Sequence, residues 1–328
     1  MVSSAVRGPN AIVLCVKATP ETRATVVPED RQHAAGTQTA AGLLVVAGAA
    51  CLSASAMFVK LADINAGTAA FLRCAVALVP LIPMLVHEAR RHGPLPGPLY
   101  RHAVSAGVFL GVDYVMWTVS ILDIGAAIST VLINVQVIAF PVLARIFSGT
   151  PIPRRFLFTT PFMLAGIALA AGVLEHDGQA PHPVRGAVLG VAAGVAYAMY
   201  LYLTRLSGQR SPQHLVAPVC ISTGSAALAS GGIALLTTGL PLAIRPAAWG
   251  WIIALALLGQ VAAWLFISKG SHRLAPNASA ALLLLQPVMA IGFGLVVLGE
   301  SPTVSQLAGC AVVIGAVWFA NRAPRRHA

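Results

Sequence analysis

Asp113 and Arg73 are the ionisable residues whose sequence surroundings point to chemistry. Each residue lies within an apolar segment. If these segments are helices that cross a membrane, both charges lie well inside it. A carboxylate at the centre of a membrane helix costs roughly 2.5–3.5 kcal/mol on insertion scales, so it should face a bundle interior. Two readings stay open. The two residues could neutralise each other, or Arg73 could bind a carboxylate of a solute while Asp113 binds an amine or a proton.

Amide and aromatic side chains accompany these charges at helical spacing. Asp113 and Trp117 are four residues apart and therefore share a helix face, and Gln260 and Trp264 repeat that spacing. Ligand cavities are mostly apolar with a few placed polar groups. Interhelical hydrogen bonding, at about 0.6 kcal/mol each, is the alternative role for the glutamines. The predicted substrate-binding residues are Arg73, Asp113, Trp117, Gln136, Tyr197, Gln260, Trp264 and Gln286.

The composition fixes the environment in which these residues act. The chain is 57% hydrophobic and 9% charged, whereas soluble domains average about 25% charged residues. The long segments are apolar on nearly every face, which excludes the alternation of barrel strands and favours helices. The net charge of +11 comes from basic residues scattered over short loops, so we expect no nucleic-acid partner. The predicted fold class is an all-α membrane protein.

Ten apolar segments are long enough to cross a bilayer, which needs about 20 helical residues. They are 41–59, 66–87, 103–122, 125–147, 156–174, 186–204, 215–238, 247–268, 278–298 and 303–320. Basic residues number fifteen on one set of loops and flanks and three on the other. Because cytosolic loops carry the excess of Lys and Arg, we expect both termini in the cytosol of a multi-pass protein of the plasma or inner membrane.

The two halves of the chain repeat one pattern. Ser129 and Gln136 recur as Ser279 and Gln286, at a shift of 150 residues. Five spans in each half is an odd number, so the second half would be inserted upside-down, with a substrate site near mid-membrane where the halves meet. The expected organisation is a disordered cytosolic tail (1–38), a first five-helix repeat (39–175), a second five-helix repeat (184–322) and a basic cytosolic tail (323–328).

Glycines at four-residue spacing predict where helices pack closely, and a group of tyrosines predicts which side chains face the site. The Gly107–Gly111 pair and the series Gly186, Gly190, Gly194 predict close helix contacts. On segment 186–204, Tyr197 and Tyr200 roughly share a face while Tyr202 points elsewhere. Tyr197 is expected deepest, with the other two nearer the inner interface.

Several short motifs carry a family resemblance. Leu284-Leu285-Gln286-Pro287-Val288, then Leu298-Gly299-Glu300-Ser301-Pro302 and Gln306-Leu307-Ala308-Gly309, resemble the end of an EamA-type domain of the drug/metabolite transporter superfamily. Phe71-Leu72-Arg73 and Gly125-Ala126-Ala127 resemble the same domain in its first copy. The first copy has Ser148-Gly149-Thr150 in place of Gly-Glu, so any role of that glutamate falls on Glu300 alone. The resemblance implies two five-helix repeats and export or exchange of small organic solutes.

A secondary transporter is therefore the leading functional hypothesis, with a small organic metabolite such as an amino acid or drug-like solute moved outward by alternating access. No GxxxxGK[ST] sequence is present to bind ATP, so a gradient would supply the energy. Asp113 is the candidate for proton coupling. We expect no catalytic residues, metal or cofactor. The alternatives are an intramembrane lipid-modifying enzyme, for which no catalytic set is evident, and a gated passive channel, which would lack a ring of like charges.

Overall fold

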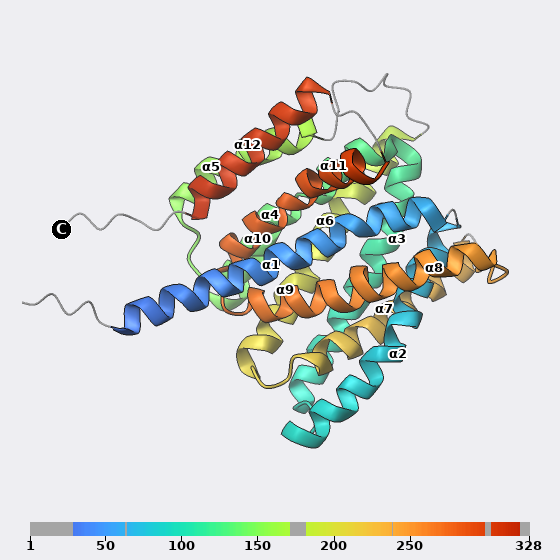
Figure 1. Cartoon of the computed structure of the whole chain (residues 1–328), viewed down its shortest axis with the longest axis horizontal. Coiled ribbons are helices and arrows are strands. Elements are labelled where there is room, and N and C mark those ends of the chain that lie inside the picture. Colours follow the sequence, from blue (N-terminus) through green and yellow to red (C-terminus); the bar gives the residue numbers. More distant parts are fainter. Residues whose placement is uncertain (1–28, 63, 171–181, 238, 299–302, 322–328) are drawn as a thin grey trace, which may run out of the picture.

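The structure is a computed structural model that describes residues 29–62, 64–170, 182–237, 239–298 and 303–321, all of them helical or in short connections (Figure 1). The elements are α1 Glu29–Ala62, α2 Ala66–His92, α3 Gly97–Ile133, α4 Gln136–Ser148, α5 Arg154–Ala170, α6 Pro183–Arg210, α7 Val216–Thr237, α8 Pro246–Ala254, η2 Leu255–Ala262, α9 Ala263–Ser271, α10 Pro276–Leu283, α11 Leu285–Leu298 and α12 Val304–Asn321. The expected all-helical fold is confirmed for these residues.

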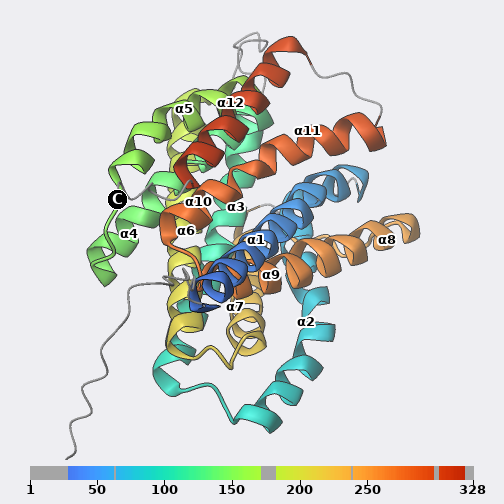
Figure 2. The same ribbon diagram turned by 60° about the vertical axis from the view of Figure 1, so that its left-hand side comes forward.

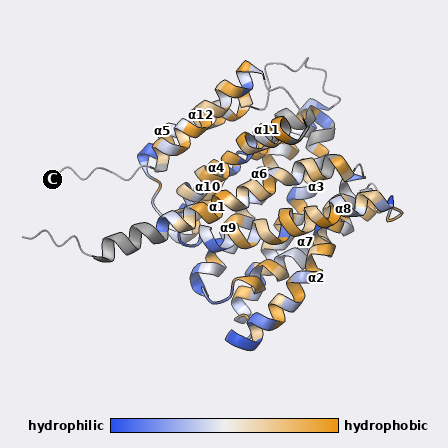
Figure 3. Cartoon of the chain, viewed as in Figure 1, coloured by the Kyte–Doolittle hydropathy of each residue, from blue (hydrophilic) through white to orange (hydrophobic). Residues whose placement is uncertain are grey.

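The outer surface of the bundle is apolar, as lipid requires. Eight helical stretches among the described residues are long and apolar enough to cross a membrane. Large side chains such as Leu236 (88% exposed) and Val296 (81% exposed) point away from the protein. Soluble monomers rarely expose contiguous apolar patches of this extent. Figure 3 shows apolar helix bodies with hydrophilic segments at the end of α2 and before α7.

The predicted segments 103–122 and 125–147 correspond to α3 and α4, with different boundaries. Helix α3 is continuous over 37 residues, but the Ser129 hydroxyl lies 3.5 Å from the Trp117 carbonyl oxygen. Twelve residues of straight helix rise about 18 Å. The chain therefore reverses direction inside α3, between these two residues, as two separate spans require.

Both repeats interrupt a helix at the same position. Helix α3 ends at Ile133 and α4 begins at Gln136, and α10 ends at Leu283 and α11 begins at Leu285. The interruptions at Asn134 and Leu284 are related by the 150-residue shift between the repeats. Segments 125–147 and 278–298, predicted as continuous, are each two helices.

The helix contacts follow the repeat. Helix α1 packs on α9 and α11, and its counterpart α6 packs on α3 and α4. Helix α2 packs on its counterpart α7, and α5 on α12. Figures 1 and 2 show α5 and α12 side by side at one edge of the bundle. Exchanging the repeats therefore maps these contacts onto one another.

Small residues set the closest of these contacts, as the sequence predicted. A side chain at Gly107 would collide with the Ser222 carbonyl on α7, and one at Gly194 would meet the Ile133 carbonyl. Glycine is needed here because two backbones approach closely. The predicted contacts are confirmed.

The described part of the chain begins at Glu29 and ends at Asn321. Helix α1 begins at Glu29, inside the segment 1–38 predicted as a tail, in a stretch that contains the strong helix former alanine. Residues 1–28, the tail 323–328 and the Gly-Glu motif at 299–300 lie outside the described residues.

Candidate functional site

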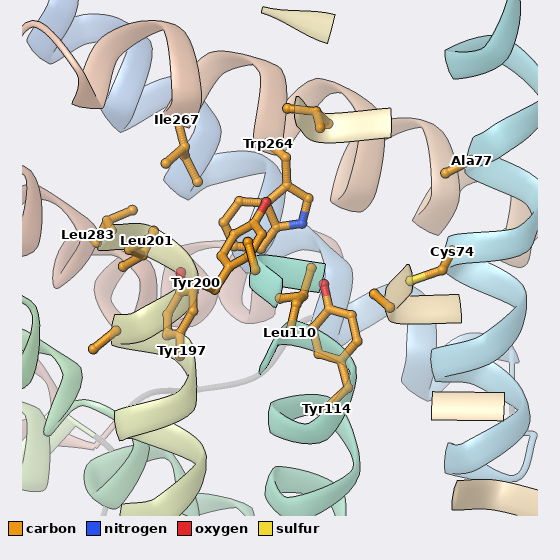
Figure 4. Close-up of a cluster of buried hydrophobic side chains, with 14 of the residues drawn as sticks. Cys74, Ala77, Leu110, Tyr114, Tyr197, Tyr200, Leu201, Trp264, Ile267 and Leu283 are labelled. Carbon is orange, nitrogen blue, oxygen red and sulfur yellow. The ribbon is translucent and has the colours of Figure 1, made fainter. Parts of the chain in front are cut away.

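Trp264 lies at the centre of a buried aromatic cluster between the repeats (Figure 4). Its ring meets Tyr200 edge-on at a centroid distance of 4.6 Å and Tyr197 at 5.9 Å. Such edge-to-face pairs contribute about 0.5–1.5 kcal/mol beyond the area they bury. The two tyrosines share a face of α6, as predicted, whereas Tyr202 contacts Ser148 and Phe147 elsewhere.

Gln260 connects three helices to this cluster. Its Oε1 accepts hydrogen bonds from the Tyr114 hydroxyl of α3 at 2.9 Å and from Trp264 Nε1 at 3.2 Å, and its Nε2 donates to Thr223 Oγ1 of α7. The amide is fully buried. Buried polar networks are rigid when their members are satisfied, so Gln260 fixes how α3, α7 and the segment η2 meet.

Arg73 is held by an irregular stretch of helix. Residues Leu255–Ala262 form a π-helix, in which the Ala263 N–H bonds to the carbonyls of Leu258 and Gln260. The Gly259 carbonyl, the acceptor that an α-helix would offer to this N–H, instead accepts from Arg73 Nη2 at 2.7 Å. The guanidinium carbon also lies 4.5 Å from the centre of the Tyr114 ring, a cation–π contact.

Asp113 does not pair with Arg73, so the neutral-pair reading is wrong for this conformation. Asp113 is 4% exposed, and its Oδ1 has no hydrogen-bond partner. A buried polar atom without a partner costs roughly 1–3 kcal/mol, more when it is charged. The carboxyl group is therefore available to a proton or to a cationic or hydrogen-bonding group of a solute.

A glutamine follows each helix interruption. Gln136 is the first residue of α4 and Gln286 the second residue of α11. Gln286 Nε2 donates to the Tyr197 hydroxyl at 3.5 Å, while the buried Oε1 of Gln136 has no partner. The backbone N–H groups at these breaks bond to carbonyls three residues earlier, as those of Asn134, Val137 and Leu284 do, so the interruptions are tightened turns of helix.

A contact between side chains or backbone of the two repeats lies at each end of the interface between them. Near the start of α6, Arg185 Nε and Nη2 donate to the two carboxylate oxygens of Asp123 at 2.7 and 2.6 Å. This hydrogen-bonded guanidinium lowers the pKa of Asp123 below its ordinary value of 3.8, and His182 adds a smaller effect in the same direction.

At the opposite end, Glu88 of α2 accepts three backbone N–H groups, those of Leu215, Val216 and Ala217, at 2.7–2.8 Å. These belong to the start of α7, where a carboxylate is favoured by the helix dipole. His214 bonds to Ser211 Oγ and donates from Nε2 to a loop carbonyl, which holds the same turn. The start of α2, in contrast, is capped by its own residue, Asn65.

The sequence profile of the EamA-like transporter family matches residues 39–172 and 184–322, most of the chain and both repeats. The chain belongs to the EamA-like transporter family. A solved structure titled "Crystal structure of protein" is similar in fold, with a TM-score of 0.71 and 16% sequence identity over 86% of this chain and 96% of that chain. A search of curated proteins gives no match.

In this EamA-like transporter, most predicted site residues lie in one connected group. Arg73, Gln260, Trp264, Tyr197 and Gln286 are joined through Tyr114 and Trp264 by the contacts above. Asp113 precedes Tyr114 in the chain, and its Oδ1 has no hydrogen-bond partner. Trp117 is half-buried with no partner for Nε1, and Gln136 is buried on α4, so no contact ties either to the group.

Sequence reasoning missed three members of the group. Tyr200, predicted near the inner interface, is fully buried against Trp264, and its hydroxyl has no hydrogen-bond partner. Thr223 follows Arg73 by the 150-residue shift between repeats, a signal that could have identified it. Tyr114 had no such signal, because in the alignment that pairs Asp113 with Gln260 and Trp117 with Trp264, a shift of 147 residues, its counterpart is Val261.

Proposed function

We propose that this EamA-like transporter is a secondary transporter that exports a small organic metabolite by alternating access. The observation that carries the proposal is the buried cluster of aromatic and amide side chains that Gln260 and Trp264 join where the repeats meet, with Asp113 next to its member Tyr114 in the chain. Asp113 Oδ1 is buried without a hydrogen-bond partner, which would destabilise a purely structural core. Together with the aromatic rings this carboxyl group suits an amphipathic solute.

The two repeats are proposed to be inverted with respect to each other, with both termini in the cytosol. The proposed ten spans, with one boundary at the reversal inside α3, give five to each repeat, and the packing of α2 on α7 and of α5 on α12 supports a two-fold axis in the membrane plane. In this orientation Glu88 lies at the cytosolic end of α2, beside Arg90 and Arg91. Asp123 then lies at the outer end.

Alternating access requires each end of the repeat interface to open in turn. We name the Glu88 contact with residues 215–217 the inner latch and the Asp123–Arg185 pair the outer latch. Each joins one repeat to the other, and both are formed in this structure. In the proposed cycle this conformation is the closed state between the inward-open and outward-open forms, and each of those forms would break one latch.

Asp113 is the proposed proton-coupling residue. It is the partnerless carboxylate of the buried group, and exchange of a proton for solute at one carboxyl group couples the two fluxes without ATP. The decisive first experiment compares metabolites in cells and medium with and without expression of this chain. One compound should accumulate in the medium, and an unchanged profile would contradict export.

That compound then serves as the solute in proteoliposomes. Asp113→Asn should abolish the dependence of transport on a pH gradient while protein abundance stays normal, because the amide cannot exchange a proton. Asp113→Glu, the matched control, should retain it. Gradient-dependent transport by the Asn variant would remove Asp113 from this role and leave solute transport itself standing.

A further inference from the structure

An apolar groove opens on the surface between α4 and α5, away from the central group. Its volume is about 230 Å³, and its walls include Pro141 and Val142 of α4 and Leu157, Thr160 and Pro161 of α5. Val142 and Leu157 are 37% and 54% exposed, so the groove faces the surroundings of the bundle and not its interior.

The groove has a structural cause. Helix α5 packs against α12, and α4 packs against α6 and α10, so the two consecutive helices are drawn apart. Figure 2 shows α5 beside α12 and α4 below them. Each wall also contains a proline inside its helix, which removes a backbone hydrogen bond and bends the helix.

Arginines stand at one end of the groove. Arg145 follows Val142 by three residues and Pro141 by four, and Arg154 precedes Leu157 by three, so both lie on the groove side of their helices. Both side chains are exposed, and Arg145 is tied only by a long bond of 3.4 Å to the Gly149 carbonyl. Residues 136–170 contain no Asp or Glu, so nothing acidic on these helices offsets the two charges.

We propose that this groove binds an anionic phospholipid, with an acyl chain along α4 and α5 and the phosphate at Arg145 and Arg154. An apolar channel that ends in guanidinium groups matches both parts of such a molecule, and basic pockets between membrane helices on the cytosolic side bind anionic headgroups. The counterpart of the loop at 149–150 in the second repeat is Gly299-Glu300, and no arginine stands at positions 295 or 304. The site is therefore specific to the first repeat.

The test measures lipid retained by the full chain in native mass spectrometry, from mixed micelles with equal phosphatidylglycerol and phosphatidylcholine. Each basic residue near the headgroup favours the anionic lipid by roughly fivefold, so two predict a preference of about 25-fold. Arg145→Gln with Arg154→Gln should reduce that preference to near equality. Arg90→Gln with Arg91→Gln, the matched control at the end of α2, should leave it unchanged.

Two further measurements separate the parts of the site. Leu157→Trp, at an exposed position, fills the groove and should lower retention of both lipids. Soluble glycerol phosphate, which has a headgroup and no acyl chain, should not compete with phosphatidylglycerol. The proposal is overturned by equal retention of both lipids, by an undiminished preference in the Arg145/Arg154 variant, or by full competition from glycerol phosphate.

Discussion

Glu88→Gln should open the inner end of the transporter while the outer end stays closed. The Glu88 carboxylate accepts three hydrogen bonds at 2.7–2.8 Å from the start of α7, and its residue is 8% exposed. Bonds to a charged group contribute roughly 1.5–3 kcal/mol each, against 0.5–1.5 for neutral ones. Glutamine keeps one acceptor oxygen and no charge, so at least one bond is lost and another weakened.

The expected loss is about 2–3 kcal/mol. The inward-open form lacks this contact in both proteins, so the whole difference appears in the equilibrium between closed and inward-open forms. At about 1.4 kcal/mol per tenfold change, the inward-open population should rise by roughly 30- to 140-fold while it remains the minor form.

Cys74 provides the reporter. It adjoins Arg73, is fully buried in this structure and points into the central cluster (Figure 4). The other cysteines, Cys15, Cys51, Cys220 and Cys310, would be replaced by serine. The rate at which a membrane-impermeant thiol reagent labels Cys74 then measures opening, from the inside or the outside of sealed vesicles.

Glu88→Gln should raise the labelling rate from the cytosolic side by the factor above and leave the rate from the outer side unchanged. Arg91→Gln, an exposed charge at the end of the same helix, is the matched control and should change neither rate. If Glu88→Gln raised outer labelling, or altered neither, the inner latch would be refuted.

Two further predictions concern Arg73 and the outer latch. Arg73→Lys should destabilise the protein by about 2 kcal/mol in detergent unfolding, because lysine loses the guanidinium bond to the π-helix. Tyr114→Phe keeps the ring beneath the cation and should cost only about 1 kcal/mol; equal stability of Arg73→Lys and wild type would contradict this reading. Because Arg185 lowers the pKa of Asp123, the outer latch stabilises the closed form above the ordinary pKa of 3.8 and is lost as pH falls through the lowered value. Because the thiolate is the reacting form, the labelling rate of Cys74 is divided at each pH by that of the unfolded protein. This ratio for outer labelling should be constant from pH 7 to pH 5 and rise only below about pH 4, whereas in Asp123→Asn it should be high throughout; a rise near pH 6 would show that another group controls the outer end.

Residue spacing was enough to predict part of the site. The three-residue step from Tyr197 to Tyr200 places both side chains on one face of the regular helix α6. Gln260 and Trp264 contact each other as their four-residue spacing predicts, although Gln260 lies in the π-helix. The family motifs predicted the two repeats by a separate signal, the resemblance of the sequence.

Contacts between distant segments were beyond such reasoning. Glu88 is at the end of a helix, where a solvated charge is the ordinary expectation, and its partners lie 127 to 129 residues later. Similar depths made an Arg73–Asp113 pair plausible, yet depth does not fix the rotation of two helices about their axes. The π-helix then supplies Arg73 with a carbonyl acceptor that no regular helix would offer.

The π-helix is a difference between the two repeats that bears on the proposed mechanism. Trp117 follows Gly111 by six positions in the first repeat, whereas Trp264 follows Gly259 by five in the second, and the π-helix lies in the second repeat. The wider turn releases one carbonyl to Arg73, and the same segment presents Gln260 to Tyr114 and Thr223. Gln260 of the second repeat has hydrogen-bond partners for both its amide oxygen and its amide nitrogen, whereas Asp113, its counterpart in the first repeat, keeps an oxygen without a partner. In the proposed mechanism this difference gives the first repeat a titratable group to bind protons or solute and the second repeat a rigid one against which it moves.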